Sequence, residues 1–414
     1  MDSLDPKSRQ PRRAGPLAGM LVLDFGQAAV GPVATEYLGM LGATVIKLEN
    51  PKGDTVRFGV PTMKGTSTTF LGNNLGKFGI VVDLKSPEGK AQAKRLIGIA
   101  DVLIENFRSN EVMVRLGLGP DVLKALNPRL IYVSSSAYGP GGPLDNMRSN
   151  EWLTQAFSGF TSVTGSKGEP GEFSRGTANL DWHGAMVNTA ALLAALVNRA
   201  RTGSGGAYVT SQLGSALYGG VTRFADVLAG RKDAGTLGSG SPHIVPDEAF
   251  QTADGWIAVS APTHGCWTRL CAALGRDDLA ADPRFANNAK RLANRDALSA
   301  LLGEIFAKSS AADWCERLGE ADVPHAKVPR NMTLLEAMDS HPQIHAEKLV
   351  RRIPSHYGSL ASQAPHWRFE HTPPAIAGGP PLLGEHTDLV LANLADKQTL
   401  IAALKATRAK EAVA

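Results

Sequence analysis

The sequence predicts an α/β fold built on a mostly parallel sheet, and three observations lead to this prediction. The chain has 414 residues, of which 43% are hydrophobic, so it can bury a large core. Short apolar runs alternate with helix-like segments from about residue 20 to residue 136. These segments are long enough to connect parallel strands as crossover helices, which would cover both faces of the sheet.

The predicted elements follow in order along the chain. MLVLDF predicts a strand, VGPVATEYLGMLG a helix and TVIKLE a second strand, which together make a βαβ unit. The alternation continues with the strand GIVVDL, a helix over about 87–99, the strand DVLIEN, a helix over about 111–126 and the strand LIYVSSS. Apolar residues at helical spacing over 184–201 predict a long buried helix that ends at TGSGG. A last helix is predicted for VLANLADKQTLIAALKA.

The sequence pattern changes near Thr236, which predicts a domain boundary there. GSGSP is followed there by a short strand, WIAV, and by several helices, which is typical of a smaller α+β domain. The first residues lack an apolar stretch and predict a frayed tail rather than a secretory signal. We expect a flexible tail over 1–17, the first part of a large domain over 18–210, a linker over 211–235, the small domain over 236–330, and a linker with a C-terminal return to the large domain over 331–414.

Composition excludes several classes of protein. The 43 Lys and Arg residues against 39 Asp and Glu residues leave a net charge of only +4, which is too small for a dedicated nucleic-acid binder. Cys266, Cys271 and Cys315 have neither the number nor the spacing of a disulfide framework or a zinc site, so we expect core cysteines and a cytoplasmic protein. The longest apolar stretch, over 185–197, is shorter than the roughly 18 residues that cross a bilayer, so no membrane partner is expected.

The turn over residues 23–32, LDFGQAAVGP, lies where an open α/β sheet normally receives a ligand. A strand ends and a helix begins there. The turn lacks the GxGxxG glycines that let a backbone approach a pyrophosphate closely, which argues against NAD binding. An ordinary βα connection remains the alternative to a binding turn.

Two further polar segments lie beside predicted strands. Asn106, Phe107 and Arg108 follow DVLIE, and their amide, aromatic ring and cation could hold an adenine and its phosphates. Asn74 and Lys77 precede GIVVDL, where the lysine could meet a phosphate as a point charge. The alternatives are a surface loop for the first segment and a solvated turn for the second.

Asp181 lies directly before the long small-residue helix and has two interpretations. A carboxylate at a helix start can cap free backbone N–H groups, which stabilises the helix by about 1 kcal/mol. A carboxylate with a pKa of about 3.9 is also ionised at neutral pH and can attack an acyl group as a covalent nucleophile. His183 is two residues away, which is poor geometry for a base that assists a nucleophile, so we expect it to be structural or to face solvent.

Many ordered motifs of the chain resemble those of the family III CoA-transferases, the group that includes formyl-CoA transferase, carnitine CoA-transferase and α-methylacyl-CoA racemase. The likeness runs from Pro16 to about Leu394. Its landmarks are LAGMLVLDFGQAAVGP, LGATVIKLENPKGDTVR, VVDLKSPEGK, ADVLIENFR, RLGLGPDVLKALNPRLIYVSSSAYGPGGP, QAFSG, ANLD, NRARTGSG, DPRFANNAKRLANRD, VPHAKVP and PPLLGEHTD.

The resemblance implies a fold, an assembly and a set of partners. It implies a homodimer of interlocked subunits, each with a Rossmann-like large domain made from both ends of the chain and a smaller α+β domain from the middle. The implied substrates are an acyl-CoA and a carboxylic acid, with coenzyme A as the group transferred. Neither a metal nor ATP is implied, because the energy of the thioester is retained.

The resemblance also implies covalent chemistry. Asp181 matches the aspartate that attacks the donor acyl-CoA, which gives a mixed anhydride and a CoA thiolate. An acceptor carboxylate then replaces the donor acid by way of an enzyme–CoA thioester or a second anhydride. Glu151 would polarise or orient the reacting groups, and its alternative is a buried salt bridge with Arg148. Gly238, Ser239, Gly240 and Ser241 match a mobile loop that covers the aspartate and excludes water, with a plain linker as the alternative.

Several positions match CoA contacts of the family, and others depart from its pattern. The matching residues are Gln27, Ala28, Asn74, Lys77, Asn106, Phe107, Arg108, Arg115 and Arg148, with Arg57 as a weaker candidate. Asn50 replaces a basic residue, and Phe78 and Gly79 replace an Arg-Ser pair, so we expect altered contacts to the CoA 3′-phosphate. Ala29 replaces the active-centre glutamine of formyl-CoA transferase, so oxalate is not carried over as a substrate.

Three rival functions remain to be weighed. A racemase needs a second proton-transfer residue, and the racemase histidine falls at Asn150, whose amide cannot accept that proton. A catalytically silent CoA-binding protein is disfavoured by the retention of Asp181 and the lid glycines. A nicotinamide oxidoreductase lacks its glycine fingerprint. Arg148 and Arg175 could pair with the second carboxylate of a dicarboxylic acid.

Overall fold

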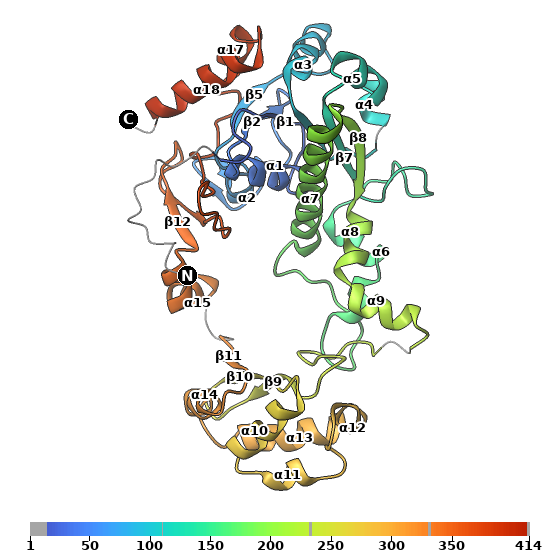
Figure 1. Cartoon of the computed structure of the whole chain (residues 1–414), viewed down its shortest axis with the longest axis vertical. Coiled ribbons are helices and arrows are strands. Elements are labelled where there is room, and N and C mark those ends of the chain that lie inside the picture. Colours follow the sequence, from blue (N-terminus) through green and yellow to red (C-terminus); the bar gives the residue numbers. More distant parts are fainter. Residues whose placement is uncertain (1–14, 110, 232–233, 330–332, 412–414) are drawn as a thin grey trace. The chain divides into compact units, whose positions relative to one another are not determined.

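A computed structural model describes residues 15–109, 111–231, 234–329 and 333–411, and it divides the chain into two compact units (Figure 1). The first unit, called the large unit, comprises Met1–Ser158, Arg175–Phe224 and His345–Ala414. The second, called the small unit, comprises Gly159–Ser174 and Ala225–Ile344. Both units are therefore assembled from segments that lie far apart in the sequence.

A six-stranded sheet forms the centre of the large unit, with the strand order β5-β2-β1-β6-β7-β8. Its strands are β1 (Leu21–Asp24), β2 (Thr44–Glu49), β5 (Phe78–Val81), β6 (Val102–Glu105), β7 (Ile131–Ser136) and β8 (Gly206–Ser211). Every neighbouring pair is parallel, which confirms the predicted parallel sheet. The chain order reverses between β1 and β6, and ligands of doubly wound sheets bind beyond the carboxyl ends of strands at such a switch point.

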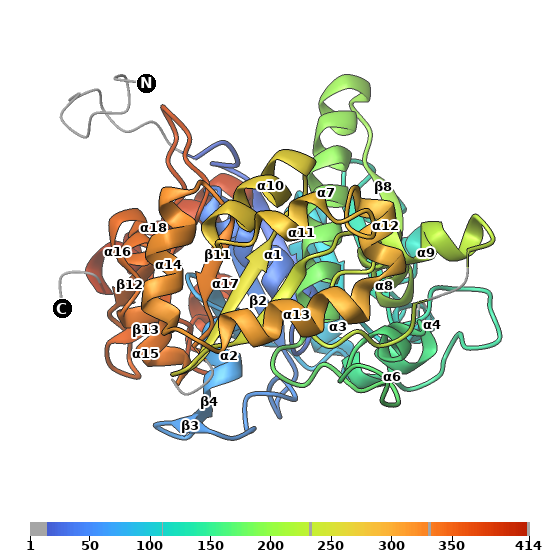
Figure 2. The same ribbon diagram turned by 90° about the horizontal axis from the view of Figure 1, so that it is seen from below.

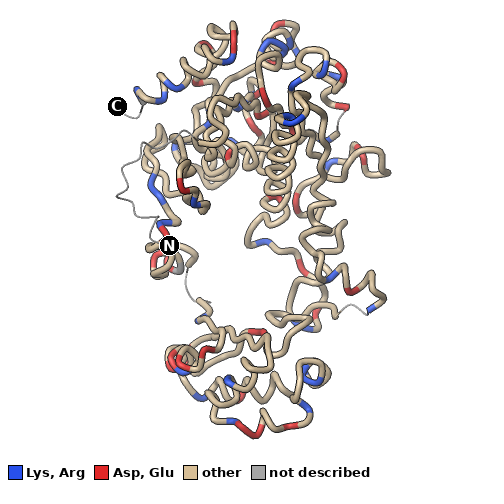
Figure 3. Tube along the Cα trace, viewed as in Figure 1, with Lys and Arg blue, Asp and Glu red and all other residues tan. Residues whose placement is uncertain are grey.

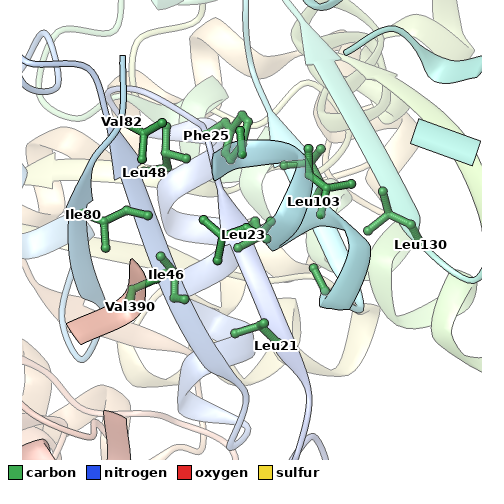
Figure 4. Packing of buried hydrophobic residues seen from close by; sticks show 14 of the residues in the cluster. Leu21, Leu23, Phe25, Ile46, Leu48, Ile80, Val82, Leu103, Leu130 and Val390 are labelled. Carbon is green, nitrogen blue, oxygen red and sulfur yellow. The ribbon is translucent and has the colours of Figure 1, made fainter. Parts of the chain in front are cut away.

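Alternating side chains of the strands build two cores, one on each face of this sheet. Leu21 and Leu23 of β1 point into the first core (Figure 4), whereas Val22 belongs to the second. The first core is covered by α3 (Pro87–Ile99), α5 (Pro120–Leu126), α17 (Thr387–Ala392) and α18 (Lys397–Glu411). The second is covered by α1 (Val30–Met40) and α7 (Asn179–Thr202). Helices thus cover both faces, and the C-terminal helices pack into the large unit.

Helix α7 has 24 residues and contains an 18-residue window with a mean hydropathy of 1.2, so by length and composition alone it could cross a membrane. Ala185, Leu192 and Ala195 of this helix are nevertheless buried against Val33 and Ala34 of α1. The place of α7 in this core explains these buried apolar residues. Core helices of this kind pass the same test of length and hydropathy as membrane spans.

Two predicted helices are each divided in the structure. The helix expected over 111–126 is α4 (Glu111–Arg115) and α5, because Gly117 adopts a φ of 73° and Pro120 begins a new helix. The last helix is α17 and α18. Asp396 accepts hydrogen bonds from the backbone N–H groups of Gln398 (2.8 Å) and Thr399 (2.9 Å), which caps α18 as a separate helix.

The small unit contains an antiparallel sheet with the order β11-β10-β9 (Figure 1) and the helices α10 to α14, which are labelled in Figure 2. Its elements are β9 (Asp247–Gln251), β10 (Trp256–Ser260), α10 (His264–Ala273), α11 (Asp277–Ala281), α12 (Asn288–Ala293), α13 (Arg295–Phe306), α14 (Ala311–Glu320) and β11 (His325–Lys327). Cys266 and Cys271 are buried in its core as predicted, whereas Cys315 is only partly buried. Acidic and basic side chains are interspersed along the trace (Figure 3).

The remaining elements are short. They are β3 (Thr62–Met63), β4 (Thr66–Ser67), α2 (Thr68–Asn73), α6 (Glu151–Phe157), η2 (Phe160–Val163), α8 (Gln212–Gly219), α9 (Val221–Leu228), α15 (Leu334–Asp339), α16 (Pro342–Glu347), β12 (Val350–Ile353) and β13 (Leu360–Gln363). Helices α8 and α9 occupy most of the segment expected as the linker over 211–235. Most of the predicted tail over 1–17 lies outside the described residues.

Candidate active site

Asn106 connects the two strands at the switch point of the large sheet. Its Oδ1 accepts a hydrogen bond from the backbone N–H of Gln27 (2.7 Å), and its Nδ2 donates to the carbonyl oxygen of Gln27 (2.8 Å). Asn106 follows β6 and Gln27 follows β1, so the side chain bridges both strand ends. The residue predicted to touch CoA through its amide thus holds the turn after β1 in place.

Ala28, the next residue of this turn, has a φ of 60°, in the left-handed region that non-glycine residues rarely adopt. Its backbone N–H donates to Oδ1 of Asp54 (3.1 Å), and its carbonyl oxygen accepts from Nδ2 of Asn73 (2.9 Å). Side chains that follow β2 and β6, together with Asn73 at the end of α2, therefore fix this turn. A turn held in this way is preorganised for a ligand.

A cavity of about 290 Å³ opens beside the turn, at the carboxyl ends of β1, β2 and β5. Apolar walls come from Phe25, Leu48, Leu84 and Phe107. Gln27, Asn50 and Lys85 add polar groups to the lining. Of the predicted CoA contacts, this cavity brings together Gln27 and Phe107. An apolar slot with a few polar groups suits a flat heterocycle such as a nucleotide base.

Lys77 and Asn74 lie inside the protein, which is inconsistent with the predicted contact between Lys77 and a phosphate. Both side chains are fully buried. The Lys77 ammonium group donates to Asp24 Oδ2 (2.8 Å), the Pro32 carbonyl (2.7 Å), the Asn73 carbonyl (3.0 Å) and Asn74 Oδ1 (2.9 Å). An ammonium group has three N–H donors, so these acceptors already saturate it. Lys77 neutralises the buried Asp24 carboxylate instead.

The predicted arginines differ in their surroundings. Arg57 is buried and forms a two-pronged ion pair with Glu49 (2.9 and 2.6 Å), so its guanidinium is already engaged. Arg108, Arg115 and Arg148 are exposed. Arg115 pairs with Glu111 one helical turn away (3.2 Å), an interaction that is weak at the surface. The exposed arginines remain accessible to a negatively charged ligand.

Asp181 is the third residue of α7, and its carboxylate does not cap the helix. The N-cap position is Ala178, which makes no side-chain cap. Instead, Nε2 of Gln212 donates a hydrogen bond to Oδ1 of Asp181. Burial and the nearby negative charge of Glu151 raise the pKa of Asp181 to about 6, although the Gln212 bond acts in the opposite direction. The carboxylate is therefore largely ionised at neutral pH but poorly hydrated.

Glu151 lies beside Asp181 and is only 5% exposed. Its Oε1 accepts hydrogen bonds from Nε2 of Gln155 (2.7 Å) and from the backbone N–H of Leu180 (3.2 Å). Glu151 therefore satisfies one of the free N–H groups at the start of α7. Its Oε2 is buried and has no hydrogen-bond partner among the residues that the structure describes. Within the same residues, no ion pair joins Glu151 to Arg148, so the alternative of a salt bridge is not supported.

The neighbouring side chains have identifiable structural contacts. The ring of His183 stacks on that of Tyr218, with centroids 6.5 Å apart. Asn150 is the N-cap of α6, where its side-chain oxygen accepts from the backbone N–H of Leu153 (3.1 Å). The guanidinium of Arg175 lies 4.2 Å from the centre of the Trp152 ring.

The predicted lid residues belong to the small unit and are tied to it by hydrogen bonds. The backbone N–H of Gly238 donates to the Gly165 carbonyl (3.1 Å), and that of Gly240 to the Leu237 carbonyl (2.9 Å). Ser239 Oγ accepts from the backbone N–H of Ala249 (3.0 Å). Gly238 has a φ of 59°, a conformation that favours glycine.

Gln212 and Thr154 are site residues that sequence reasoning missed. Gln212 Oε1 accepts a hydrogen bond from Thr154 Oγ1 (2.7 Å), so the amide connects Thr154 to Asp181. Gln212 lies 31 residues after Asp181, on the far side of β8. Its position directly after a parallel strand is the signal that could have identified it, because polar residues at such strand ends often face a site.

No group of three or more His, Cys, Asp or Glu side chains in the described part of the chain could hold a metal ion. The acidic pair near α7 consists of Asp181 and Glu151, and their recorded bonds are to protein donors. The chemistry that this arrangement can perform with its own groups is attack by a carboxylate on an electrophilic carbon.

Comparison with known proteins relates the whole chain to one family. The family model described as CoA-transferase family III matches residues 17–387. The succinate–glutarate CoA-transferase of Agrobacterium fabrum is 32% identical, over 93% of this chain and 97% of the relative. The acetyl-CoA:oxalate CoA-transferase of Acetobacter aceti is 35% identical, over 75% of this chain and 80% of the relative.

Solved structures show the same similarity. The Rv3272 protein of Mycobacterium tuberculosis superimposes with a TM-score of 0.80 and 31% identity, over 92% of this chain and 99% of the other. A CAIB/BAIF family protein of Brucella suis gives a TM-score of 0.78 and 29% identity, over 92% of this chain and 100% of the other.

Proposed function

Since this chain belongs to CoA-transferase family III, we propose that it moves CoA from an acyl-CoA thioester to a free carboxylic acid through a covalent intermediate on Asp181. The single observation that carries the proposal is the state of this carboxylate. Asp181 is partly buried at the start of α7, is held through one oxygen by Gln212 and has a pKa of about 6. It is thus an ionised, weakly hydrated nucleophile at neutral pH.

The transfer proceeds by exchange at acyl carbons. An oxygen of Asp181 attacks the thioester carbon of the donor, the carbon–sulfur bond breaks, and its electron pair leaves on the CoA sulfur. The product is a mixed anhydride with CoA thiolate alongside it. The acceptor carboxylate then replaces the donor acid, by way of an enzyme–CoA thioester or a second anhydride, and leaves as the new acyl-CoA. No step consumes ATP, since each bond broken is matched by one of similar energy.

Glu151 has an orienting role in this proposal. Its bond to the backbone N–H of Leu180 holds the first turn of α7, and therefore Asp181, in place. Its negative charge also raises the pKa of Asp181, which makes the carboxylate a stronger base and nucleophile when ionised. Glu151 is thus a positioning residue that acts through Asp181.

The cavity beside the turn after β1 is the proposed site for the adenine of CoA. Gln27 and Phe107 line it, and Ala28 continues the same turn toward α1. A Cβ atom at Gly184 of α7 would lie only 3.4 Å from Val30, the first residue of α1. The turn therefore leads from the cavity toward the helix that carries Asp181. Arg108, Arg115 and Arg148 are the exposed cations proposed to meet the CoA phosphates.

The acceptor is proposed to be a dicarboxylic acid. Relatives include the succinate–glutarate CoA-transferase of Agrobacterium fabrum and the beta subunit of a succinyl-CoA–L-malate CoA-transferase of Chloroflexus aurantiacus. Arg175 lies over the ring of Trp152, which is the neighbour of Glu151 in α6. A guanidinium can pair with a second carboxylate through two parallel hydrogen bonds. A racemase is not favoured, because Asn150 caps α6 and offers no proton-accepting group.

Mass spectrometry of intact protein and of its peptides tests this function. The protein is incubated with a panel of acyl-CoAs, succinyl-CoA among them, and then with free acids such as glutarate and malate. We expect an adduct on the peptide that contains Asp181 and CoA transfer to an added acid. Asp181→Ala should lose both, and His183→Ala should keep both. Transfer by the Asp181→Ala variant would contradict the mechanism, and an inert wild-type protein would favour a silent CoA-binding protein.

A further inference from the structure

We infer that Gln212, oriented by Thr154, is a catalytic hydrogen-bond donor to Oδ1 of Asp181. Its hydrogen bond leaves Oδ2 to attack the donor acyl carbon. It then stabilises negative charge on Oδ1 when the carbonyl carbon of Asp181, Cγ, is itself attacked. This inference deepens the proposed function and rests on it. The observation behind it is the continuous set of hydrogen bonds from Thr154 through Gln212 to Asp181.

The backbone holds Gln212 firmly. Gln212 is the first residue of α8 and directly follows β8 in the large sheet. Ser211, the N-cap of α8, accepts a hydrogen bond from the backbone N–H of Gly214 (3.0 Å) and fixes the start of the helix. Gln212 is 6% exposed and Thr154 is fully buried. The amide is therefore delivered to Asp181 by a strand end and a capped helix, which are rigid elements.

Hydrogen-bond chemistry determines which way the amide of Gln212 points. An ionised carboxylate can only accept hydrogen bonds, so Nε2 must face Asp181. Oε1 is then turned to Thr154, whose hydroxyl donates to it at 2.7 Å. A flipped amide would place its oxygen against the carboxylate and leave Thr154 without this acceptor. Thr154 thereby selects the orientation in which Gln212 acts as a donor.

The bond to Gln212 makes the two carboxylate oxygens unequal. Among the described residues, the side-chain carboxylate of Asp181 accepts its hydrogen bond from Gln212, through Oδ1. Asp181 is partly exposed, whereas Gln212 and Thr154 are buried behind it. Oδ2 is consequently the oxygen with free lone pairs for attack on a donor acyl carbon.

The second half of the reaction gives Gln212 its catalytic effect. After the first attack, the anhydride joins Asp181 Cγ to the donor acyl carbon through Oδ2, and Oδ1 is a carbonyl oxygen. When the CoA thiolate attacks Cγ, a carbon–sulfur bond forms and the carbonyl π electrons move onto Oδ1. The Cγ–Oδ2 bond then breaks, and the donor acid leaves with that electron pair. A donor already bonded to Oδ1 stabilises this oxyanion, as in other acyl transfers.

The test measures the rate at which CoA becomes attached to Asp181 in a single turnover with donor acyl-CoA alone. Gln212→Met removes the donor and keeps a side chain of similar length, and Thr154→Val removes only the hydroxyl that orients the amide. Loss of one oxyanion donor typically slows acyl transfer by about 100- to 1,000-fold, so we expect a decrease of about 100-fold for Gln212→Met and about 10-fold for Thr154→Val. The KM for acyl-CoA should change less than threefold, because neither side chain is proposed to bind CoA.

Two further readouts distinguish catalysis from structure. The adduct in Gln212→Met should shift from CoA-bearing toward acyl-bearing protein, because attack on Cγ is the slowed step. The acid limb of the rate–pH profile should move to higher pH, since a lost hydrogen bond to the ionised form raises the pKa of Asp181. Thr189→Val is the matched control: Thr189 is a buried threonine of α7 whose hydroxyl bonds to its own helix at the Ala185 carbonyl (2.8 Å), and its variant should behave as wild type.

Each outcome bears on one proposal. If Gln212→Met shows the rate, the adducts and the acid limb of the wild-type protein, the role of Gln212 is overturned. The proposed function still stands in that case if Asp181→Asn forms no adduct. If Gln212→Met does not fold, Thr154→Val decides, and an unchanged rate in that variant overturns the inference. CoA transfer by Asp181→Asn would refute the proposed function itself.

Discussion

Asp181 shows how the surroundings of one residue set its chemistry. Partial burial and Glu151 work against its charge, while Gln212 favours it. The net effect is a pKa of about 6, which lies just below neutral pH. Such a group is mostly ionised at neutral pH, but it takes up a proton at a higher pH than an exposed aspartate does.

This pKa predicts the acid limb of activity. The attacking form is the carboxylate, so kcat/KM should fall about tenfold per pH unit below about pH 6 and level off above it. A plot of log kcat/KM from pH 4.5 to pH 8 measures the limb. A midpoint near 4, the value of an exposed aspartate, would show that burial and Glu151 do not act on the nucleophile as described.

The same shift predicts how Asp181 affects stability. A carboxyl whose pKa is higher in the folded than in the unfolded protein makes the fold less stable when it ionises, and this loss develops as the pH rises from about 4 to about 6. Asp181→Asn should therefore raise the free energy of unfolding by roughly 1–3 kcal/mol at pH 7.5 and by much less at pH 4. Urea denaturation at both pH values checks this, and an equal effect at both would contradict it.

Sequence reasoning reached some of these residues and not others. Asp181 was identified from its position before the long helix and then by the family resemblance, and Glu151 by the resemblance alone; the charge of Glu151 raises the pKa of Asp181. The position of Lys77 before a strand indicated an exposed side chain that could contact a phosphate. The side chain is instead buried, because it pairs with Asp24 of another strand. Gln212 was missed because its partner, Asp181, becomes its neighbour only when β8 joins the sheet.

At the scale of elements, buried ion pairs fix the ends of strands. Lys77, just before β5, pairs with Asp24 of β1 (2.8 Å), and Lys47 of β2 pairs with Asp54 (2.9 Å). All of these side chains are almost fully buried. Lys47 also donates a hydrogen bond to the carbonyl oxygen of Gly26, so a side chain as well as the strand ladder connects the carboxyl ends of β1 and β2, where the cavity lies.

Lys77→Met tests whether this lysine is structural. Removing it leaves the buried Asp24 carboxylate without its hydrogen-bonded ion-pair partner, and loss of one partner of a buried pair typically costs about 3–5 kcal/mol of unfolding free energy. Chemical denaturation measures the loss. Lys94→Met, at an exposed position of α3, is the control and should change stability by less than about 0.5 kcal/mol. A stable Lys77→Met protein with impaired CoA binding would instead restore the predicted phosphate contact.

The glycine-rich loop over 238–241 gives a prediction for the proposed lid. A Cβ atom at Gly240 would lie 3.1 Å from the Leu237 carbonyl, so Gly240→Val should distort the loop. If the loop keeps water from the anhydride, this variant should raise the ratio of acyl-CoA hydrolysis to transfer by about tenfold. Release of free CoA without an acceptor measures hydrolysis. Gly255→Ala, at a turn with open space, should leave the ratio unchanged, and an unchanged ratio in Gly240→Val would make the loop a plain linker.

The elements themselves were largely predictable, because a hydrophobic period identifies long buried strands and helices. Strands β1, β2, β5, β6 and β7 and helices α1, α3 and α7 match the predicted order, whereas β8 was not predicted. The division of the last helix at Asp396 was not predicted, since the apolar period continues across it. Strands β3 and β4, with two residues each, carry too few side chains to show any period.

For the whole molecule, α7 presents a second, outward face. Trp182, Met186 and Val197 lie on this helix at spacings near whole turns and are 36%, 39% and 61% exposed. Apolar side chains aligned on a surface mark sites of association between proteins. We propose this stripe of α7 as an interface of the homodimer that the family resemblance implies.

The homodimer has its own test. Met186→Lys combined with Val197→Lys should raise the dissociation constant of the dimer at least tenfold, because these charges would be buried at the interface. Mass photometry over a dilution series measures this. Val114→Lys, at an exposed apolar position of α4, is the matched control. A wild-type protein that is monomeric at micromolar concentration would contradict the proposal. Tagged and untagged chains mixed after folding should also fail to exchange if the subunits are interlocked.

The return of α17 and α18 to the large unit bears on how the chain is made. Leu23 and Ile46 face a core that Val390, Leu400 and Leu404 complete. These last residues leave the ribosome only after the strands of the large sheet and the 225–344 segment have been synthesised. The part of this core that α17 and α18 cover therefore stays exposed until then, although α3 and α5 of the same core have already been made. Nascent chains stalled before residue 387 should accordingly be held by chaperones that bind exposed apolar surfaces.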